Sequence, residues 1–451
     1  MASLSTYEVA YPDVLHPLIN EKQQLKEKYI QLLGYYVDLF LEGSEKSKSA
    51  YRLDILSKIL LNKLAVELPV FDAKAYVESF SSVSRTRFTP FRLFSYRYLF
   101  LFDALFVLGI DDNDLGNRLC EEILKMTNKR FHASLKEMVR KMYSGDTSFA
   151  VKRIVSPEMV EAWVDARKFL SSNEKKITFT ATMSAGKSTL INALIGKELS
   201  FSKKAACTST VMRFLTSPCK TQVFSVCDGS ETISFMKEQE VREFTNSLTK
   251  PCEIMGYFDS VLTTQRIAVV DTPGVNSSLN PMHKKITREE LKSGTDILVY
   301  VIPVESYGSE DDYNHLHYIK KNISYKKILF VVNMMDSCDF EDDTTEEIVC
   351  NIRNHLSDIG FEDGVVCPMS AKAGVLLKKA VAGVELSDND KKACQTFVKQ
   401  FTDENLQLGK YYPSSEIKID HKADASIWQA FISTGVPGFE NLLYQYIREE
   451  Q

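Results

Sequence analysis

The segment from Ala181 to Thr189 reads Ala-Thr-Met-Ser-Ala-Gly-Lys-Ser-Thr and follows a short apolar run. It matches the phosphate-loop pattern GxxxxGK[ST], except that alanine replaces the first glycine. Such a loop points successive N–H groups at the α- and β-phosphates of a nucleotide and ends on a helix N-terminus. Ala181 is compatible with this turn if its φ is negative. We therefore predict a phosphate site made by Ser184, Ala185, Gly186, Lys187, Ser188 and Thr189.

Three residues of this loop have separate predicted tasks. Lys187 would reach the β- and γ-phosphates, and the Ser188 hydroxyl would hold Mg²⁺. Gly186 has no side chain to obstruct the approach of the nucleotide. The alternative is a chance Gly-Lys-Ser-Thr on an ordinary strand–helix turn, and the motifs farther along the chain argue against it.

A second motif, Asp271-Thr-Pro-Gly274, ends another apolar run. Its carboxylate can order the water shell of Mg²⁺, and the Gly274 N–H can meet the γ-phosphate. Thr208 lies between the two motifs, where a threonine can complete the metal shell. We predict Ser188, Thr208 and Asp271 as the metal site. Lys187, Thr208 and Gly274 are the predicted catalytic groups.

Two further motifs would read the base. Asn333-Met-Met-Asp336 and Ser370-Ala-Lys372 each follow a buried apolar run. Asp336 would accept hydrogen bonds from guanine N1–H and the exocyclic amine, which adenine cannot supply in that arrangement. All four motifs come at carboxyl ends of predicted strands, where open α/β sheets bind ligands. The prediction is GTP or GDP, with base contacts from Asn333, Asp336, Ser370, Ala371 and Lys372.

Two positions depart from this pattern. Met334 stands where the base-reading motif usually has lysine, and its thioether can still cover the face of the base. We expect lower affinity with the specificity of Asp336 preserved. Val275 stands where Ras-like enzymes place a glutamine that orients water. Hydrolysis must then use backbone groups, Thr208 or a group brought by a partner.

The elements that position these motifs begin at Lys175. Short apolar runs alternate there with helical segments, which predicts a doubly wound, mostly parallel sheet, the fold of P-loop GTPases. The expected strands are 177–183, 211–215, 221–226, 266–271, 296–304, 327–333 and 364–370. An insertion at about 382–432 is polar and irregular, with a helix at 389–403 and a loop around 411–426. A final helix is expected at 439–449.

Residues 1–172 have a helical pattern throughout, and we find no convincing strand there. Helices are expected at 19–41, 52–66, 91–109, 115–126, 131–143 and 157–170, with a break at 43–49. Ser156 is the expected N-cap of the last helix, with Pro157 at its first position. The predicted organisation is an all-α domain at 1–172 followed by the GTPase domain at 173–451.

Composition narrows the function classes. The chain has 451 residues, with 55 basic and 60 acidic side chains and a net charge of −5, which does not support broad binding of nucleic acid. Nine scattered cysteines predict reduced thiols in a cytosol. No signal peptide is visible, and the most apolar stretch, 98–110, is shorter than the about 20 residues that cross a bilayer. We expect a soluble cytoplasmic protein whose membrane contact is at most peripheral.

The stretch 85–106 combines aromatic residues with arginines. One interpretation is a basic-aromatic surface for lipid head groups or a partner helix. The other is the core helix of the N-terminal domain, and we favour that one.

Several motifs together resemble the dynamin superfamily, specifically bacterial dynamin-like proteins, over roughly residues 173–451. They are SAGKSTLINALIG at 184–196, the long gap from Lys187 to Asp271, DTPGVNSSLNPMHKKITREELKSGTDILVYV at 271–301, and SAKAGVLLKKA followed by TGVPGFENLL. The resemblance implies a GTPase domain with bundle helices upstream and hydrolysis of GTP stimulated when GTPase domains pair. The partner would be a second copy or a longer dynamin-like protein. Met183 stands where the family often has glutamine. The membrane-remodelling members carry a long helical trunk after this domain, which residues 1–451 do not supply, so we do not expect fission or fusion of membranes by this chain alone.

Two other functions stay open at this point. The chain could be a switch module that holds GTP and hydrolyses it negligibly, which Met183, Val275 and Met334 favour. It could also be a structural partner that supplies one GTPase domain to a heteromer. The intact lysine and serine of the phosphate loop argue against a GTPase domain that binds no nucleotide.

Overall fold

The computed structural model describes residues 4, 9–82, 95–149, 155–182, 184–200, 210–221, 223–229, 233–248, 250–275, 281–340, 343–413 and 424–449. The chain divides into two compact units. The helical unit comprises Ser3–Ser172 together with Ser217–Gln222, and the sheet unit comprises Asn173–Thr216 and Val223–Gln451. The short segment 217–222 was not predicted to join the helices. There the Asp13 N–H donates to the Lys220 carbonyl at 2.7 Å.

The helical unit is built from helices, as predicted. The Ser156 side chain accepts from the Met159 N–H at the start of the last one, and Pro157 occupies its first turn, so the predicted N-cap is confirmed. The helices are α1 (Gln23–Phe40), α2 (Gly43–Leu61), α3 (Ala73–Ser82), α4 (Arg97–Leu108), α5 (Asn113–Lys125), α6 (His132–Ser144) and α7 (Pro157–Leu170).

The predicted break at 43–49 is wrong, because α2 begins at Gly43. The serines, lysines and glutamate of this segment are compatible with an exposed helical turn. Glu45 and Lys48 form an ion pair of 3.0 Å across one turn. The helix α3 was not predicted.

Helix α4 is a core helix. Every residue from Leu99 to Leu108 is buried, which confirms the second interpretation of the aromatic stretch for this part; residues 83–94 lie outside the described residues. The acid in its middle, Asp103, accepts hydrogen bonds from the hydroxyls of Tyr11 and Tyr29 at 2.6 and 2.5 Å. No helix within the described part of the chain is both long and apolar enough to span a bilayer.

In the sheet unit, nine strands of the described residues form one sheet with the order β4-β3-β5-β2-β6-β1-β7-β8-β9. The half from β6 to β9 is parallel. In the other half, β2 and β5 pair in parallel and the other three pairs are antiparallel. Most strand pairs are therefore parallel, which confirms the predicted mostly parallel sheet. The strands are β1 (Lys175–Thr180), β2 (Met212–Thr216), β3 (Phe224–Cys227), β4 (Ser234–Met236), β5 (Cys252–Gly256), β6 (Ile267–Asp271), β7 (Thr295–Pro303), β8 (Tyr325–Asn333) and β9 (Val365–Pro368). The two strands β4 and β5 were not predicted.

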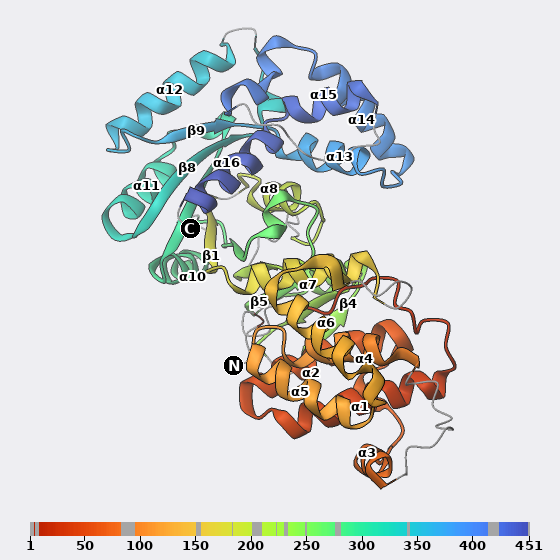
Figure 1. The fold of residues 1–451 in the computed structure, drawn as a ribbon. Coiled ribbons are helices and arrows are strands. Elements are labelled where there is room, and N and C mark those ends of the chain that lie inside the picture. Colours follow the sequence, from red (N-terminus) through yellow and green to blue (C-terminus); the bar gives the residue numbers. More distant parts are fainter. Residues whose placement is uncertain are drawn as a thin grey trace. The chain divides into compact units, whose positions relative to one another are not determined.

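Both faces of the sheet are covered by helices, because the central strands are apolar on both sides. In β7, Ile297 and Val299 belong to one core, whereas Leu298 and Tyr300 belong to the other. The first core includes residues of α8 and α16, and the second includes residues of α11, α12, α14 and α15 (Figure 1). The helices are α8 (Lys187–Ile195), α9 (Glu238–Thr245), α10 (Pro281–Lys292), α11 (Glu310–Asn322), α12 (Thr345–Asp358), α13 (Ala371–Val381), α14 (Asp388–Gln400), α15 (Ala425–Ser433) and α16 (Val436–Glu449).

The predicted insertion is more ordered than its polarity suggested. Its expected helix is α14, and the expected loop around 411–426 falls largely on 414–423, outside the described residues. The helix α15 then begins at Ala425, and Phe431 is fully buried in the second core. The last helix begins at Val436, so the glycine and proline before 439 belong to its first turn.

Candidate functional site

The predicted motifs meet at one edge of the sheet. The strands β1, β6, β8 and β9 all belong to the parallel half, so their carboxyl ends lie on the same side. The phosphate loop follows β1, Asp271 ends β6, Asn333 ends β8, and Ser370 comes two residues after β9. This edge is where ligands of open α/β sheets bind.

The phosphate loop has the backbone that its sequence requires. Gly186 has φ +81° directly before α8, and Ser184 has φ +59°. Ala181 is buried and does not have a positive φ, so the condition for alanine at this position is met. Its carbonyl accepts a hydrogen bond of 3.0 Å from the Val275 N–H, which ties the second motif to the loop. Met183 lies outside the described residues.

Asn333 connects three of the predicted motifs. Its amide nitrogen donates to the Ala185 carbonyl at 3.0 Å, inside the phosphate loop. Its amide oxygen accepts from the Ala371 N–H, also at 3.0 Å. The side chain is 2% exposed. Asn333 therefore holds the phosphate loop and the two base-reading motifs together, a positioning task that the sequence alone did not reveal.

The predicted base reader, Asp336, is held in place from two sides. The Ser370 hydroxyl donates to its Oδ1 at 2.6 Å. The Gln400 side chain, from α14 of the insertion, donates to its backbone carbonyl at 2.6 Å. Met334 has φ +68°, and its methyl carbon would lie 3.5 Å from a Cβ atom placed on Gly186. The thioether thus lies beside the phosphate loop.

Asp271 has the features expected of a magnesium-ordering carboxylate. Its Oδ2 accepts hydrogen bonds from the hydroxyls of Ser188 at 2.7 Å and Ser200 at 2.8 Å. Its Oδ1 is buried and has no hydrogen-bond partner among the described residues. Burial raises the pKa of this carboxyl, against the lowering effect of Lys187 and the two hydroxyls. A divalent cation would give Oδ1 a partner, and its positive charge would stabilise the buried carboxylate. The residues present therefore fit Mg²⁺.

The surroundings suit a metal that keeps oxygen ligands. Within the described ranges, no cluster of three or more histidine, cysteine or acidic side chains could hold a metal ion. Mg²⁺ is usually held by one or two protein oxygens together with phosphates and water. Ser200 is a neighbour that sequence reasoning missed, and it is fixed by Asn192, whose side chain donates to the Ser200 carbonyl at 2.7 Å. Thr208, the third predicted ligand, lies outside the described residues.

A cavity of about 340 Å³ joins the start of α8 to the last predicted motif. Ser188 and Thr189 line one part of it, and Lys372 lines another. Phe397 of α14 also lines this cavity, so the insertion contributes to the site. Of the predicted catalytic groups, Lys187 is 7% exposed at the start of α8. Gly274 lies between Asp271 and Val275, and Val275 is 3% exposed.

His315 is a second neighbour of the phosphate loop that was not predicted. It lies on α11, and its Nε2 is 2.9 Å from the Thr180 hydroxyl at the end of β1. Burial lowers the pKa of His315 to about 3, with further lowering by Arg288 and Lys187. The ring is therefore neutral at neutral pH. His283, on α10, has its pKa lowered by partial burial and by Lys187.

Comparisons with known proteins give one match to a family profile and several to solved structures. Residues 177–335 match the sequence profile described as the dynamin family. A search of curated proteins finds no match. Two solved structures, both described as an oligomerised bacterial dynamin pair that provides a mechanism for the long-range sensing and tethering of membranes, are similar at 15% and 14% identity. Each alignment covers 96% of this chain and 74% of the other, with TM-scores of 0.38 and 0.37.

Proposed function

We propose that this chain hydrolyses GTP to GDP and phosphate and that pairing of GTPase domains stimulates the reaction, because residues 177–335 match the sequence profile of the dynamin family. The observation that supports this most directly is Asn333, which bonds the phosphate loop to the base-reading motifs. A phosphate site and a guanine site are useful together only at a fixed separation. The hydrogen bonds of Asn333 fix that separation.

Nucleotide binding would rest on charge and backbone dipoles at the start of α8. The N-terminus of α8 supplies the positive end of the helix dipole, and Lys187 supplies the counter-charge for the phosphates. Ser188 and Asp271 would hold Mg²⁺, with Thr208 as the third predicted ligand. When bound, the ion neutralises charge on the β- and γ-phosphate oxygens.

Base selection would rest on Asp336. The Ser370 hydroxyl donates to one oxygen of Asp336 and so orients the carboxylate. A carboxylate in this position accepts from guanine N1–H and the exocyclic amine, whereas adenine presents an acceptor at N1. Lys372 lines the same cavity as Ser188, so it can cover the nucleotide. The backbone before Lys372 is held by the hydrogen bond from the Ala371 N–H to Asn333.

Hydrolysis would be slow in an isolated chain. Val275 is buried, and its N–H is already bound to the Ala181 carbonyl, so this position cannot orient an attacking water. The remaining groups are Lys187, Thr208 and the backbone at Gly274. They stabilise charge but hold water poorly, and preorganised donors of this kind are typically worth about 3–4 kcal/mol each. Docking of a second GTPase domain across the nucleotide would rigidify the two predicted switches, 200–210 and 271–287.

The pairing partner would be a second copy of this chain or a longer dynamin-like protein. We place the protein in the cytoplasm, with peripheral membrane contact at most and no nucleic-acid partner. The buried Val275 also favours a second candidate function, a switch module that binds GTP and hydrolyses it negligibly.

Specific activity measured over a roughly hundredfold range of protein concentration separates these functions. We expect it to rise as the concentration approaches the pairing constant. Thr208→Ala should remove the rise and leave GTP binding largely intact. Thr264→Ala is the matched control, because Thr264 is exposed in the 3₁₀ turn Val261–Thr264, at the amino edge of the sheet away from the site. A flat profile in which Thr208→Ala behaves like the control would overturn paired catalysis.

A further inference from the structure

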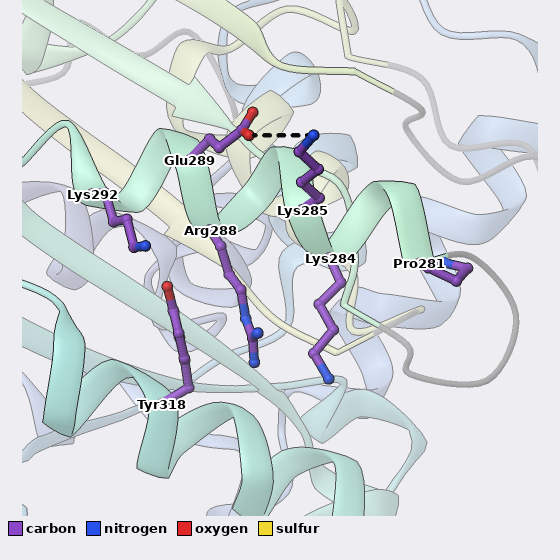
Figure 2. A pocket seen from close by; sticks show the side chains of 7 residues that line it. All are labelled: Pro281, Lys284, Lys285, Arg288, Glu289, Lys292 and Tyr318. Carbon is purple, nitrogen blue, oxygen red and sulfur yellow. Dashed lines mark ion pairs between the residues drawn. The ribbon is translucent and has the colours of Figure 1, made fainter.

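Helix α10 presents a row of three cations to α11. Lys284, Arg288 and Lys292 are spaced by four residues, which keeps them on one face of the helix. Figure 2 shows their side chains on the side of α10 that faces Tyr318 of α11. Lys285 lies on the other side of α10 in the same view, and it pairs with Glu289 at 3.9 Å.

A cavity of about 340 Å³ opens beside this row. Among the described residues, Lys284, Arg288 and Lys292 have no carboxylate within ion-pair distance. Like charges four residues apart destabilise a helix, so repulsion among these three cations lowers the stability of α10. The lining consists of Pro281, Lys284, Lys285, Arg288, Glu289, Lys292 and Tyr318.

Two polar atoms of the lining are buried without a partner. They are Nε of Arg288 and the hydroxyl of Tyr318, neither of which has a hydrogen-bond partner among the described residues. The Arg288 guanidinium lies 3.9 Å from the centroid of the Tyr318 ring, a cation–π contact that fixes both groups. Buried donors without acceptors are costly. An acceptor-rich anion in the cavity would satisfy both atoms.

We propose that this cavity binds a phosphomonoester, separately from the nucleotide site. A phosphate dianion offers only acceptors, and the planar fork of Arg288 matches its geometry. Lys284 and Lys292 would flank the group, and the Tyr318 hydroxyl would donate to it. The volume is within the range of small-molecule sites, so it accommodates the organic part of the ligand as well.

The position of the cavity also suggests regulation, an extension that rests on the proposed function. Thr287, next to Arg288 on α10, donates to the Pro273 carbonyl at 2.7 Å, inside the Asp271–Gly274 motif. On the other side, Arg288 and Lys284 act electrostatically on His315, which bonds Thr180 before the phosphate loop. An anion bound at Arg288 would therefore influence both the Asp271–Gly274 motif and the phosphate loop.

The binding proposal is tested with glycerol 3-phosphate as the soluble probe, titrated by calorimetry into the full chain with Mg²⁺ and saturating GDP to fill the phosphate loop. We expect Lys284→Gln and Lys292→Gln each to weaken binding about tenfold or more, since each removes one charge-assisted hydrogen bond. Tyr318→Phe keeps the ring and should weaken binding severalfold. Lys321→Gln is the charge-matched control, an exposed lysine of α11 outside the cavity, and should bind like the wild type.

Vesicles of phosphatidylcholine with and without phosphatidic acid form the second arm, because that lipid carries the same phosphomonoester. Binding of the soluble probe that depends on Lys284 identifies a soluble ligand. Binding only to vesicles with the same dependence identifies a lipid head group. The proposal is overturned if neither probe binds, or if Lys284→Gln and Lys321→Gln lose binding equally. If the chain fails to bind GDP, the proposed function fails, and the same comparison of variants without nucleotide still decides the cavity.

Discussion

Gly186→Ala tests how the nucleotide site is held together. Gly186 has φ +81°, and a Cβ atom there would lie 2.3 Å from Nδ2 of Asn333. Left-handed backbone costs an ordinary residue about 1–2 kcal/mol. Displacing Nδ2 of Asn333 leaves the Ala185 carbonyl without its partner, which costs about 1–3 kcal/mol. The expected loss in free energy of unfolding is therefore about 2–5 kcal/mol.

The two parts of this loss can be separated by a double-mutant cycle. In an Asn333→Ala background the collision is absent, so Gly186→Ala should cost only the backbone strain, about 1–2 kcal/mol. Gly294→Ala provides the strain alone in the wild type, because Gly294 has φ +87° and nothing within 4 Å of the added Cβ. Urea unfolding measures all variants, and GTP titration follows the site. Equal costs for Gly186→Ala in both backgrounds would refute the contact with Asn333.

Three further predictions concern the charges of the site. Asp336→Asn should shift preference from guanine toward xanthine, whose C2 oxygen needs a donor, measured by competition against a fluorescent GTP analogue; a wild type that binds ATP as tightly as GTP would contradict the guanine assignment. Asp271→Asn removes a charge that burial disfavours, so the nucleotide-free protein should lose less than about 1 kcal/mol of unfolding free energy. In the same variant, Mg²⁺ should no longer raise the affinity for GTP. An unchanged effect of Mg²⁺ in GTP titrations would exclude this carboxylate from the metal site. Burial lowers the pKa of His315 to about 3. Below about pH 6.5 the unfolded chain therefore binds a proton that the folded chain does not. As the pH is lowered from about 6.5 to about 3, the free energy of unfolding should decrease by at most about 1.4 kcal/mol per pH unit. Urea unfolding at several pH values should show a shallower slope for His315→Gln, and an unaltered slope would mean that another group titrates.

The motifs and the parallel half of the sheet were predictable because their signals are local. A phosphate loop is recognised within nine residues, and the apolar runs of β6, β7 and β8 are continuous because both faces are buried. The short strands β4 and β5 carry weaker patterns and were missed. The helix α2 was misjudged because polar residues on an exposed turn look the same as a loop in sequence.

The contacts that hold the site could not be predicted for a different reason. Asn333 and Ala185 are 148 residues apart, and His315 and Thr180 are 135 apart. Such pairs depend on the order of strands in the sheet, which sequence patterns do not specify. Ser200 was missed likewise, because its hydroxyl reaches Asp271 only once the chain has folded. Sequence motifs therefore identify candidate ligand-binding groups better than the groups that position them.

Asp271 suggests how binding of a metal ion would affect Ser200. In the structure, one oxygen of Asp271 accepts from both Ser188 and Ser200, and Ser200 is the last described residue before 201–209. A cation held by Ser188 and Asp271 would compete with the hydrogen bond between them, because the Ser188 oxygen would turn its lone pairs to the metal. It would also offset the burial that raises the pKa of Asp271. Asp271 would then be charged when it accepts the hydrogen bond from Ser200. This would strengthen the bond, because charge-assisted hydrogen bonds are roughly twice as strong as neutral ones. The strength of the hydrogen bond that holds Ser200 would thus depend on the metal.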